Sequence, residues 1–334
     1  MTDKPSNEAF LRLADPLRRE LLAHCYRMMG SVHDAEDLVQ ETYLRAWRAY
    51  DGFEGRSSLR TWLYRIATTQ CLTALDSRGR RPLPTGLGAP AAEPSAPLVE
   101  RREVPWLEPV PDGLVGAGTD DPASIVTSRE SIRLALVAAL QHLPPRQRAV
   151  LVLRDVLRWR AAEVAEVLDT TTTAVNSILQ RARAQLQEVA PSLDDRPAPL
   201  TPDQRSLLDR YLRAFEDYDV HAMVELFTKD AIYEMPPFDG WYQGPAEIVE
   251  LIRTHCPARG PGDLRLVPTR ANGQPAYAMY LRQGEVHRAF AVLVLTLTGS
   301  LVSHVALFFD ARLFDAFELP STLPVSRDQA FATK

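Results

Sequence analysis

The residues from Asp34 to Leu75 limit most strongly what this chain can fold into, because they predict two helices of opposite character joined by a short loop that contains glycine. Asp34 is placed to cap the amino end of the first helix. One side of that helix is predicted to be apolar from residues that recur at helical spacing, namely Ala35, Leu38, Val39, Thr42, Ala46 and Trp47.

The opposite side of the first helix carries charged residues. Asp37 and Glu41 are like charges four positions apart, and their repulsion destabilises an isolated helix by roughly 0.2 to 0.5 kcal/mol. The opposite charges of Glu41 and Arg45, also four positions apart, stabilise the helix by a similar amount. An acidic face that does not stabilise its own helix is consistent with a docking surface for a partner. An ordinary solvated face explains the same residues equally well.

The second helix is predicted to follow the loop from Phe53 to Ser58, where a serine can accept the free amide hydrogens of the first turn. From Arg56 to Arg81 there are six arginines and one acid, a local charge of +5 in a chain whose net charge is -5. Arginines interleaved with Trp62 and Tyr64 suit single-stranded nucleic acid, because cations neutralise phosphates while aromatic rings stack on unpaired bases. Trp62 by itself is more typical of a core residue than of a stacking platform.

The strings DAEDLVQETYLRAW and FEGRSSLRTWLYRIA resemble region 2 of the extracytoplasmic-function group of the sigma-70 family, the initiation factors of bacterial RNA polymerase. The resemblance implies that the first helix docks on the clamp helices of the largest polymerase subunit through Asp34, Asp37, Gln40 and Glu41. It also implies that the loop and second helix bind the non-template strand of the minus-10 element and capture a flipped base. The residues implied are Phe53, Gly55, Arg56, Ser57, Ser58, Arg60, Tyr64, Arg65, Thr69, Arg78, Arg80 and Arg81. Many members have Asn where this chain has Thr69, which leaves open which base is captured.

Length and composition fit a protein of two or three domains, since the chain has 334 residues of which 46% are hydrophobic. The net charge of -5 argues against indiscriminate binding to DNA. The three cysteines are far apart and have no metal-ligand spacing, which predicts reduced thiols and a cytoplasmic protein. No amino-terminal signal pattern is present, and the most apolar run, residues 290–297, is too short to span a membrane.

Residues 1–81 are expected to form an all-helical first domain, with a helical pattern over residues 9–30 that Pro16 breaks and Gly30 ends. Residues 82–122 contain nine prolines and follow neither helical nor strand periodicity. We expect an extended linker there, because such a segment cannot bury enough apolar surface to offset its ordering entropy. Fully stretched, it would reach on the order of 140 Å. The resemblance implies that this linker passes near the polymerase active centre and the RNA exit channel.

Residues 123–190 are expected to form a second helical domain, with helices over 123–143 and 146–156 and a helix-turn-helix over about 161–187. Asn176, Gln180 and Arg183 share the polar side of the last helix, and their chemistry suits adenine and guanine edges in the major groove. A surface amphipathic helix would also carry polar residues there. The strings LPPRQR, EVAEVL and VNSILQRAR resemble sigma region 4, which implies that Thr172, Thr173, Asn176, Gln180, Arg181 and Arg183 read the minus-35 element. The turn has Leu168-Asp169 where Leu-Gly is common.

A hinge over residues 191–202 separates these helices from a third domain, residues 203–320, followed by a tail at 321–334. We expect helices at 203–217, 219–228 and 245–254, and strands at 231–235, 264–270, 275–282, 286–298 and 301–309. Helices followed by antiparallel strands indicate an α+β domain. The strings YLRAFEDYDVHAMVELFTKDAIYEMPP and WYQGPAEIVELI resemble the SnoaL-like branch of the NTF2-like cone fold, whose sheet encloses a pocket. The whole chain resembles sigma factors with a fused carboxyl-terminal SnoaL-like domain, the group that includes the SigG and SigJ types.

Some SnoaL-like proteins are cyclases or isomerases, so the third domain has candidates for proton transfer: Tyr233, Trp241, Tyr280, His287, His304 and Asp310. The candidate ligand pocket comprises Tyr233, Trp241, Tyr280 and His304, although His304 on a strand face is more typical of a hydrogen-bonded core residue. No paired carboxylates, Ser/His/Asp set, phosphate loop or metal cluster is visible, so we predict no catalytic residue, no metal and no cofactor.

The sequence therefore predicts a sigma factor that is not an enzyme, whose partners are core RNA polymerase and promoter DNA and whose third domain regulates it in cis. A small-molecule ligand of that domain is a further candidate partner, and no membrane association is expected. Two alternatives stay open: an autonomous helix-turn-helix regulator, and a SnoaL-like enzyme fused to a DNA-binding module.

Overall fold

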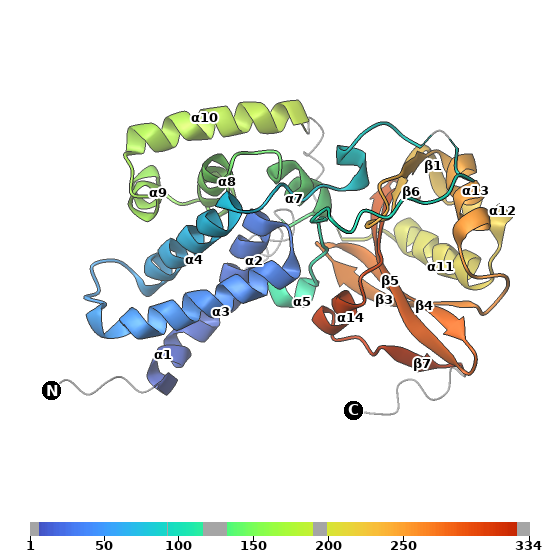
Figure 1. Ribbon diagram of the computed structural model, residues 1–334, viewed down its shortest axis with the longest axis horizontal. Helices are drawn as coiled ribbons and strands as arrows, with labels where there is room; N and C mark the ends of the chain where they lie inside the picture. Colours follow the sequence, from blue (N-terminus) through green and yellow to red (C-terminus); the bar gives the residue numbers. More distant parts are fainter. Residues whose placement is uncertain (1–6, 92, 116–131, 190–198, 326–334) are drawn as a thin grey trace. The chain divides into compact units, whose positions relative to one another are not determined.

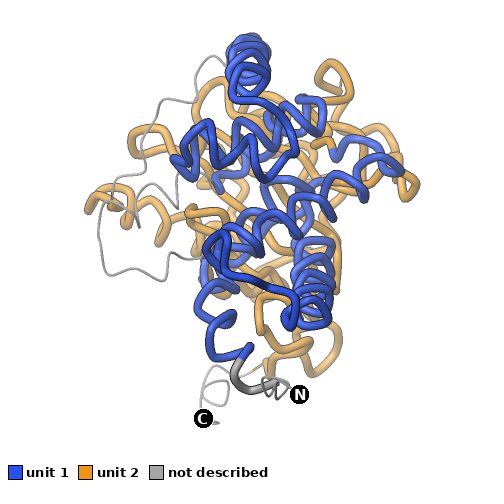
Figure 2. The backbone as a smooth tube through the Cα atoms, turned by 90° about the vertical axis from the view of Figure 1, so that its left-hand side faces the viewer, with its two compact units in different colours: residues 1–81, 107–197 blue, residues 82–106, 198–334 orange. Residues whose placement is uncertain are grey.

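The computed structural model describes residues 7–91, 93–115, 132–189 and 199–325 (Figure 1). The chain forms two compact units, which we call the helical unit, residues 1–81 and 107–197, and the C-terminal unit, residues 82–106 and 198–334 (Figure 2). Each unit is therefore built from segments that are far apart in the sequence. The start of the helix predicted over residues 123–143 and most of the hinge predicted over 191–202 lie outside the described residues.

The helical unit begins with the interruption that Pro16 predicts. The chain forms α1 (Asn7–Ala14), a 3-10 turn η1 (Asp15–Leu17) and α2 (Arg18–Met29). Gly30 ends α2 in the left-handed conformation at φ 69°, which a residue with a Cβ adopts only with strain. A Cβ at this position would also lie 2.8 Å from Cδ1 of Leu107, so glycine is needed where these two segments meet.

The two helices that dominate the sequence pattern are α3 (Val32–Ala49) and α4 (Leu59–Asp76). Ser58 caps α4 as expected, by accepting from the amide of Thr61. The cap predicted for α3 was wrong, because Ser31 caps this helix by accepting from the amide of Asp34 at 3.1 Å. Trp47 also departs from the predicted apolar core face, since the end of α3 leaves 41% of it exposed.

The remaining helices of this unit are α5 (Asp112–Val115), α7 (Leu134–Leu140), α8 (Pro145–Leu151), the π-helical turn η4 (Val152–Val156), α9 (Ala161–Val167) and α10 (Thr172–Val189). α9 and α10 form the predicted helix-turn-helix. Asp169 takes the left-handed conformation in the turn at φ 49°, a role that Asp fills more easily than most residues. Thr171 accepts from the amide of Ala174 at the start of α10.

Arg148 fixes α8 to the end of α2. Its buried guanidinium donates to the backbone oxygen of Met28, to Oε1 of Gln141 at 2.8 Å and to the backbone oxygen of Leu143 at 3.2 Å. Burial lowers the pKa of Arg148 to about 10, so the group stays charged at neutral pH. A buried charge is tolerated where several acceptors surround it, and here they join the two helical parts of the unit.

The proline-rich segment differs from the expected free linker. Residues 82–106 belong to the C-terminal unit, and we call them the strap, while residues 107–115 pack in the helical unit. The strap forms a short 3-10 turn, η3 (Pro84–Gly86), and its backbone bonds to loops of the other elements, as between the amide of Arg101 and the oxygen of Pro237 at 2.8 Å. Its partners are residues far along the chain, which the periodicity of the segment itself cannot reveal.

The C-terminal unit is the expected α+β fold, a curved sheet covered by helices (Figure 1). Its helices are α11 (Pro202–Glu216), α12 (Val220–Val224), α13 (Pro245–His255) and α14 (Arg312–Ala316). Its strands are β1 (Phe227–Glu234), β2 (Trp241–Gln243), β3 (Leu264–Ala271), β4 (Gln274–Gln283), β5 (Val286–Thr298), β6 (Leu301–Phe308) and β7 (Thr322–Pro324).

The strand order is β2-β1-β6-β5-β4-β3, with β7 paired to β5. The four strands predicted at the end of the chain form antiparallel pairs, but β1 pairs with β6 in parallel, which departs from the expected antiparallel sheet. The short elements β2, α14 and β7 were not predicted, and β7 extends the domain into the predicted tail. Strands of three residues carry too little alternation to be recognised in a sequence.

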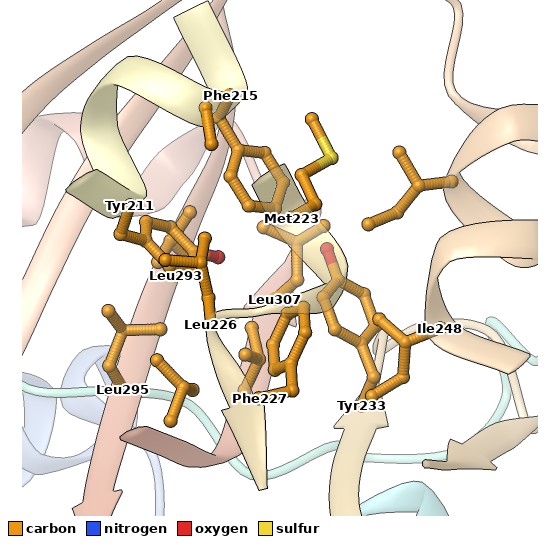
Figure 3. Packing of buried hydrophobic residues seen from close by; sticks show 14 of the residues in the cluster. Tyr211, Phe215, Met223, Leu226, Phe227, Tyr233, Ile248, Leu293, Leu295 and Leu307 are labelled. Atoms are coloured by element: carbon orange, nitrogen blue, oxygen red, sulfur yellow. The ribbon is translucent and has the colours of Figure 1, made fainter. Parts of the chain in front are cut away.

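The core of this unit lies between the sheet and helices α11 and α13. Tyr211 and Phe215 of α11 stack on each other at 4.5 Å between ring centroids, and Tyr277 of β4 stacks on Tyr211 at 6.0 Å. Figure 3 shows Tyr211, Phe215, Met223, Tyr233 and Ile248 converging on one interior. The helices therefore cover one face of the sheet and enclose the space described below.

Candidate functional site

The outer side of α3 carries the residues predicted to dock on polymerase. Asp37 and Gln40 are exposed, and Glu41 is half-buried and pairs with Arg45 one turn later at 2.5 Å. A groove of about 410 Å³ between α1 and α3 adjoins them, and Leu44 and Trp47 are exposed at its edge. This side of α3 therefore combines carboxylates with an apolar strip, as protein interfaces do.

Asp34 lies apart from this surface. Its carboxylate pairs with Arg78 and Arg81 at 2.5 Å each, and only 14% of its side chain is exposed. Burial alone would raise the pKa of Asp34, but the two guanidinium groups outweigh burial and lower it. Asp34 thus holds the basic segment that follows α4 against the start of α3.

The loop before α4 and one side of that helix are open to solvent. Phe53 stacks on Trp62 at 4.7 Å, so the two rings form a single aromatic platform. Gly55 is left-handed at φ 69°, and nothing lies within 4 Å of where its Cβ would be. Arg65 and Thr69 are exposed on the next turns of α4, as are Arg56 and Ser58 around the loop, where Ser57 is half-buried. Exposed cations beside stacked rings are what single-stranded DNA binding requires.

Arg60 and Tyr64 lie on another side of α4, which the helix-turn-helix part of the same unit covers. Tyr64 is 0% exposed, and its ring lies 5.0 Å from that of Trp159, just before α9. The Arg60 guanidinium lies over both rings, at 5.0 Å and 5.3 Å, and donates to both carboxylate oxygens of Glu20 in α2 at 2.9 Å. In this arrangement Tyr64 is inaccessible to a base, in contrast to the role predicted from the sequence.

Two further cations of the basic segment have partners within the helical unit. Arg80 contacts Nδ1 of His142 at 3.0 Å through Nη1, and Arg81 is the group paired with Asp34. Burial, followed by the charge of Arg80, lowers the pKa of His142, so the ring is neutral at physiological pH. The local charge of +5 counted along the sequence is therefore partly neutralised by tertiary contacts.

The helix α10 presents most of its predicted reading residues to solvent. Thr172, Thr173, Asn176, Gln180 and Arg181 are exposed. Arg183 is exposed but occupied, since its guanidinium donates to both oxygens of Asp155 in η4 at 2.6 Å and 2.8 Å. The structure therefore presents Asn176 and Gln180 to solvent and holds Arg183 in an ion pair that DNA would have to replace.

The C-terminal unit contains an apolar cavity of about 280 Å³. Of the four predicted pocket residues, one lies on the wall of this cavity and three lie elsewhere. Tyr233 lines the cavity. Trp241 lies away from it and donates from its indole nitrogen to the oxygen of Gly88 in the strap at 2.9 Å. Tyr280 donates to the oxygen of Pro320 at 2.9 Å, so neither of these aromatic residues contributes to the cavity wall.

His304 is paired with a carboxylate that the sequence analysis missed. Its Nε2 lies 2.7 Å from Oε1 of Glu234, which is 0% exposed, and Oε2 of Glu234 accepts from the amide of Thr85 in the strap at 2.9 Å. The pair lies outside the cavity wall. It anchors the strap to β1 and β6, which is a structural task.

The other candidates for proton transfer also have structural partners. His287 lies 2.9 Å from the oxygen of Gly262 through Nε2, and Asp310 pairs with Arg312 at 2.6 Å. The cavity wall contains no carboxylate among the described residues. His255 lies on that wall, and its Nε2 contacts the oxygen of Pro94 at 3.0 Å.

Within the described parts of the chain, no group of three or more His, Cys, Asp or Glu side chains is arranged to hold a metal ion. The three cysteines are free thiols. None of the described helices is both long and apolar enough to cross a membrane.

The sequence analysis missed several residues because their partners are distant in the chain. Arg60 pairs with Glu20 and contacts the ring of Trp159, and Glu108 accepts from Oγ of Ser31 at 2.6 Å and contacts Nδ1 of His33 at 2.9 Å. The one available signal was the pair Trp106 and Leu107, apolar residues that stand out in the proline-rich segment and are both buried.

Three family models match the chain in the order of its parts. Residues 13–81 match sigma-70 region 2, residues 133–186 match sigma-70 region 4, and residues 208–305 match a SnoaL-like domain. The surfaces of α3 and α4 fall in the first match, the helix-turn-helix in the second and the cavity in the third.

The chain is also similar to named proteins over most of its length. The chain is 64% identical over 310 residues, 92% of this chain and 83% of the relative, to "ECF RNA polymerase sigma factor SigG" of Mycobacterium tuberculosis (strain ATCC 25618 / H37Rv). It is 30% identical to "ECF RNA polymerase sigma factor SigJ" of the same strain, over 85% of this chain and 86% of that one. The crystal structure of M. tuberculosis SigJ superposes with a TM-score of 0.58 at 23% identity, covering 91% of this chain and 98% of the other, which indicates a shared fold.

Proposed function

Because the chain belongs to the ECF RNA polymerase sigma factors, we propose that it is a promoter-specificity subunit of RNA polymerase whose C-terminal unit regulates it in cis. The observation that carries the first part is the pairing of an exposed basic and aromatic surface on α4 with a helix-turn-helix in the same polypeptide. A promoter with two recognition elements requires two such surfaces.

Core polymerase binds the outer side of α3 in this proposal. Asp37 and Glu41 supply charge, Gln40 supplies hydrogen bonds, and Leu44 and Trp47 supply apolar contact area. Asp34 has a different task, since it is engaged by Arg78 and Arg81. It keeps the basic segment folded against α3.

The minus-10 strand binds the loop before α4 and the open side of this helix. The platform of Phe53 and Trp62 stacks on a base, while Arg56 and Arg65 neutralise phosphates. Thr69 occupies the position of base selection. The residues of α10, with Asn176 and Gln180 foremost, contact the minus-35 element in the major groove.

The helical unit is closed in this structure, and DNA binding requires it to open. Tyr64 becomes available only when Trp159 moves away from α4, and the same movement releases the Arg60 guanidinium from its contact with the Trp159 ring. Arg183 becomes available only when it leaves Asp155. A partner opens such a unit to the extent that it binds the open state more tightly than the closed one, so docking on core polymerase is the step we assign to opening.

Regulation in cis follows from the strap. The chain leaves the helical unit at residue 81 and returns at residue 107, and the strap between them is folded onto the C-terminal unit. An undocked strap would reach roughly 85 Å when extended, whereas the docked strap holds its residues on β1, β2 and α13. The C-terminal unit thereby controls how far the two DNA-binding parts can separate.

We assign no catalytic task to the C-terminal unit. A proton-transfer enzyme needs an acid or base facing its substrate, and the cavity wall of this unit has no carboxylate among its described residues. Action on RNA polymerase and promoter DNA also places the protein in the cytoplasm.

Transcription with purified components tests both parts of the proposal. The full chain added to core polymerase is expected to direct run-off transcription from a mapped cognate promoter, and failure to bind core polymerase would refute the sigma-factor assignment. For regulation in cis, Trp241→Phe removes the bond to Gly88 and Glu234→Gln weakens the anchor of Thr85, so the doubly substituted chain is expected to change transcript yield. Equal yields from the two chains would refute control by the strap.

A control variant separates loss of the strap from general damage to the C-terminal unit. Tyr280→Phe removes the hydroxyl bond to Pro320 in the same unit, far along the chain from the strap anchors. This variant is expected to give the yield of the unsubstituted chain. A matching change in yield would assign the effect to the fold of the unit and would contradict the strap mechanism.

A further inference from the structure

The cavity of the C-terminal unit is enclosed almost wholly by apolar side chains. Its wall combines residues of α11, α13 and five strands, among them Phe215, Leu251, Met279, Phe290 and Leu307. Its volume is about 280 Å³. An apolar cavity of about 150 Å³ in another protein stays dry and binds benzene, so this one has room for a molecule about the size of two fused rings.

One polar group on the wall has no partner. Tyr233 is 2% exposed, and none of the described residues forms a hydrogen bond with its hydroxyl. Figure 3 shows this hydroxyl directed into the middle of the cluster, near Met223. A ligand oxygen facing this hydroxyl would accept a hydrogen bond from it, which contributes about 0.5 to 1.5 kcal/mol net.

The rest of the wall favours an uncharged ligand. No Arg, Lys, Asp or Glu lies among the lining residues of the described chain. Cys256 lines the cavity, and burial raises the pKa of its thiol, so it stays neutral. His255 is engaged with the oxygen of Pro94. A charged ligand would lose its hydration without gaining an opposite charge.

The strap forms one side of this cavity. Leu98 of the strap lies on the wall, between two points where the strap is held. On one side His255 contacts the oxygen of Pro94 at 3.0 Å, and on the other the amide of Asp239 donates to the oxygen of Val99 at 3.1 Å. A molecule in the cavity therefore touches the same segment that joins the two DNA-binding parts of the chain.

We propose that this cavity is a binding site for a small, uncharged and mainly apolar molecule that carries one hydrogen-bond-accepting oxygen. Tyr233 donates to that oxygen, and Leu98 closes the site as part of the strap. Occupancy holds the strap against the C-terminal unit, because the ligand adds contacts to Leu98 that are lost when the strap leaves. The binding site stands by itself, and only its regulatory consequence rests on the proposed control in cis.

Binding is tested with a matched pair of probes, the bicyclic ketone 1-tetralone and its hydrocarbon tetralin, titrated calorimetrically into the full chain. Tetralone is expected to bind about three- to tenfold more tightly than tetralin, the range of one net hydrogen bond. Tyr233→Phe is expected to remove this difference, and Tyr280→Phe to leave it unchanged, since the Tyr280 hydroxyl bonds to Pro320. Absence of binding by both probes, or equal affinities in the unsubstituted chain, would overturn the assignment without any variant having to fold.

Closure by the strap is tested in the same samples by limited proteolysis. Arg101 and Arg102 are exposed on the strap, and trypsin cleavage after them, followed by mass spectrometry, reports how often the strap leaves the unit. Saturating tetralone is expected to slow this cleavage several-fold. Binding without any slowing would overturn closure by the strap. Slowed cleavage with no change in promoter output would instead refute the proposed regulation and leave the binding site in place.

Discussion

Replacing Trp159 by alanine is expected to open the helical unit and strengthen its binding to single-stranded DNA in the absence of polymerase. Trp159 is 5% exposed, and its ring contacts Tyr64 at 5.0 Å and the Arg60 guanidinium at 5.3 Å. These contacts join α4 to the segment before α9, so they stabilise only the closed unit. Their loss uncovers Tyr64 and frees Arg60 from its contact with the indole ring, and both are proposed to contact DNA.

The magnitude follows from the two contacts. An aromatic pair contributes about 0.5 to 1.5 kcal/mol beyond burial, and a partly buried cation–π contact adds about 0.5 to 2 kcal/mol. Removing both shifts the equilibrium toward the open unit by about 1 to 3 kcal/mol, which corresponds to about 5- to 150-fold. Affinity for DNA rises by the same factor until the open state is the major one.

The assay is fluorescence polarisation of a labelled single strand carrying the non-template minus-10 sequence, at one fixed salt concentration because phosphate contacts make affinity salt-dependent. Trp47→Ala serves as the matched control, since it removes an exposed tryptophan of α3 outside the contact with α4. Thermal unfolding of each variant shows that the helical unit remains folded.

A double-mutant cycle identifies the cause. Because Tyr64 takes part in the closed contact and in the proposed DNA contact, the gain from Trp159→Ala is expected to be much smaller in a chain that already carries Tyr64→Ala. A folded Trp159→Ala variant with unchanged affinity for the single strand would refute the inference that the closed unit masks this side of α4.

Three further outcomes are expected. Gln180→Ala, on the exposed side of α10, should lower discrimination at one base of the minus-35 element by about 1 to 3 kcal/mol in a DNA competition assay and leave core polymerase affinity unchanged. Equal losses of affinity for all DNA sequences would contradict base reading by this residue. Asp37→Lys, on the exposed side of α3, should lower core polymerase affinity in a pull-down titration while promoter sequence preference is kept; unchanged affinity would exclude this side of α3 as the docking surface. For Glu108, burial raises the pKa, but the contacts with His33 and Ser31 outweigh burial and lower it. The ionised carboxylate therefore stabilises the fold above its ordinary pKa of about 4.3, and this stabilisation is lost as pH falls through the lower pKa of the folded state. In thermal unfolding, stability should decrease less between about pH 6 and about pH 3 for Glu108→Gln than for the unsubstituted chain.

The sequence by itself determined the longer elements of both units. Helical periodicity predicted α3, α4, α9 and α10, and a capping serine marked the start of α4, because amphipathic spacing and caps act within a few residues of the chain. The four long strands β3 to β6 were predicted from apolar stretches bounded by Gly or Pro, which are also local signals. The family motifs lie in these elements, so the two DNA-binding segments were recognised before their structure was known.

Only the tertiary structure decided which of these residues are accessible. Arg60 and Arg65 have the same chemistry and lie five residues apart on one helix, yet Arg60 is paired with Glu20 and lies against Trp159 while Arg65 faces solvent. The partners of Arg60 are 40 residues before it and far beyond it in the chain, and no local pattern encodes such a pairing. A count of charges along the sequence therefore overstated the free basic surface.

The same limit explains the strap and the cavity. A proline-rich segment without periodicity is typical of a free linker, and it folds here because β1, β2 and α13 supply hydrogen-bond partners from the other end of the chain. Tyr233 was among the pocket residues predicted with the SnoaL-like resemblance, whereas Leu98 was not, because its contact with the cavity exists only once the strap has docked. Local sequence determined what each segment forms, and long-range contacts decided what each segment covers.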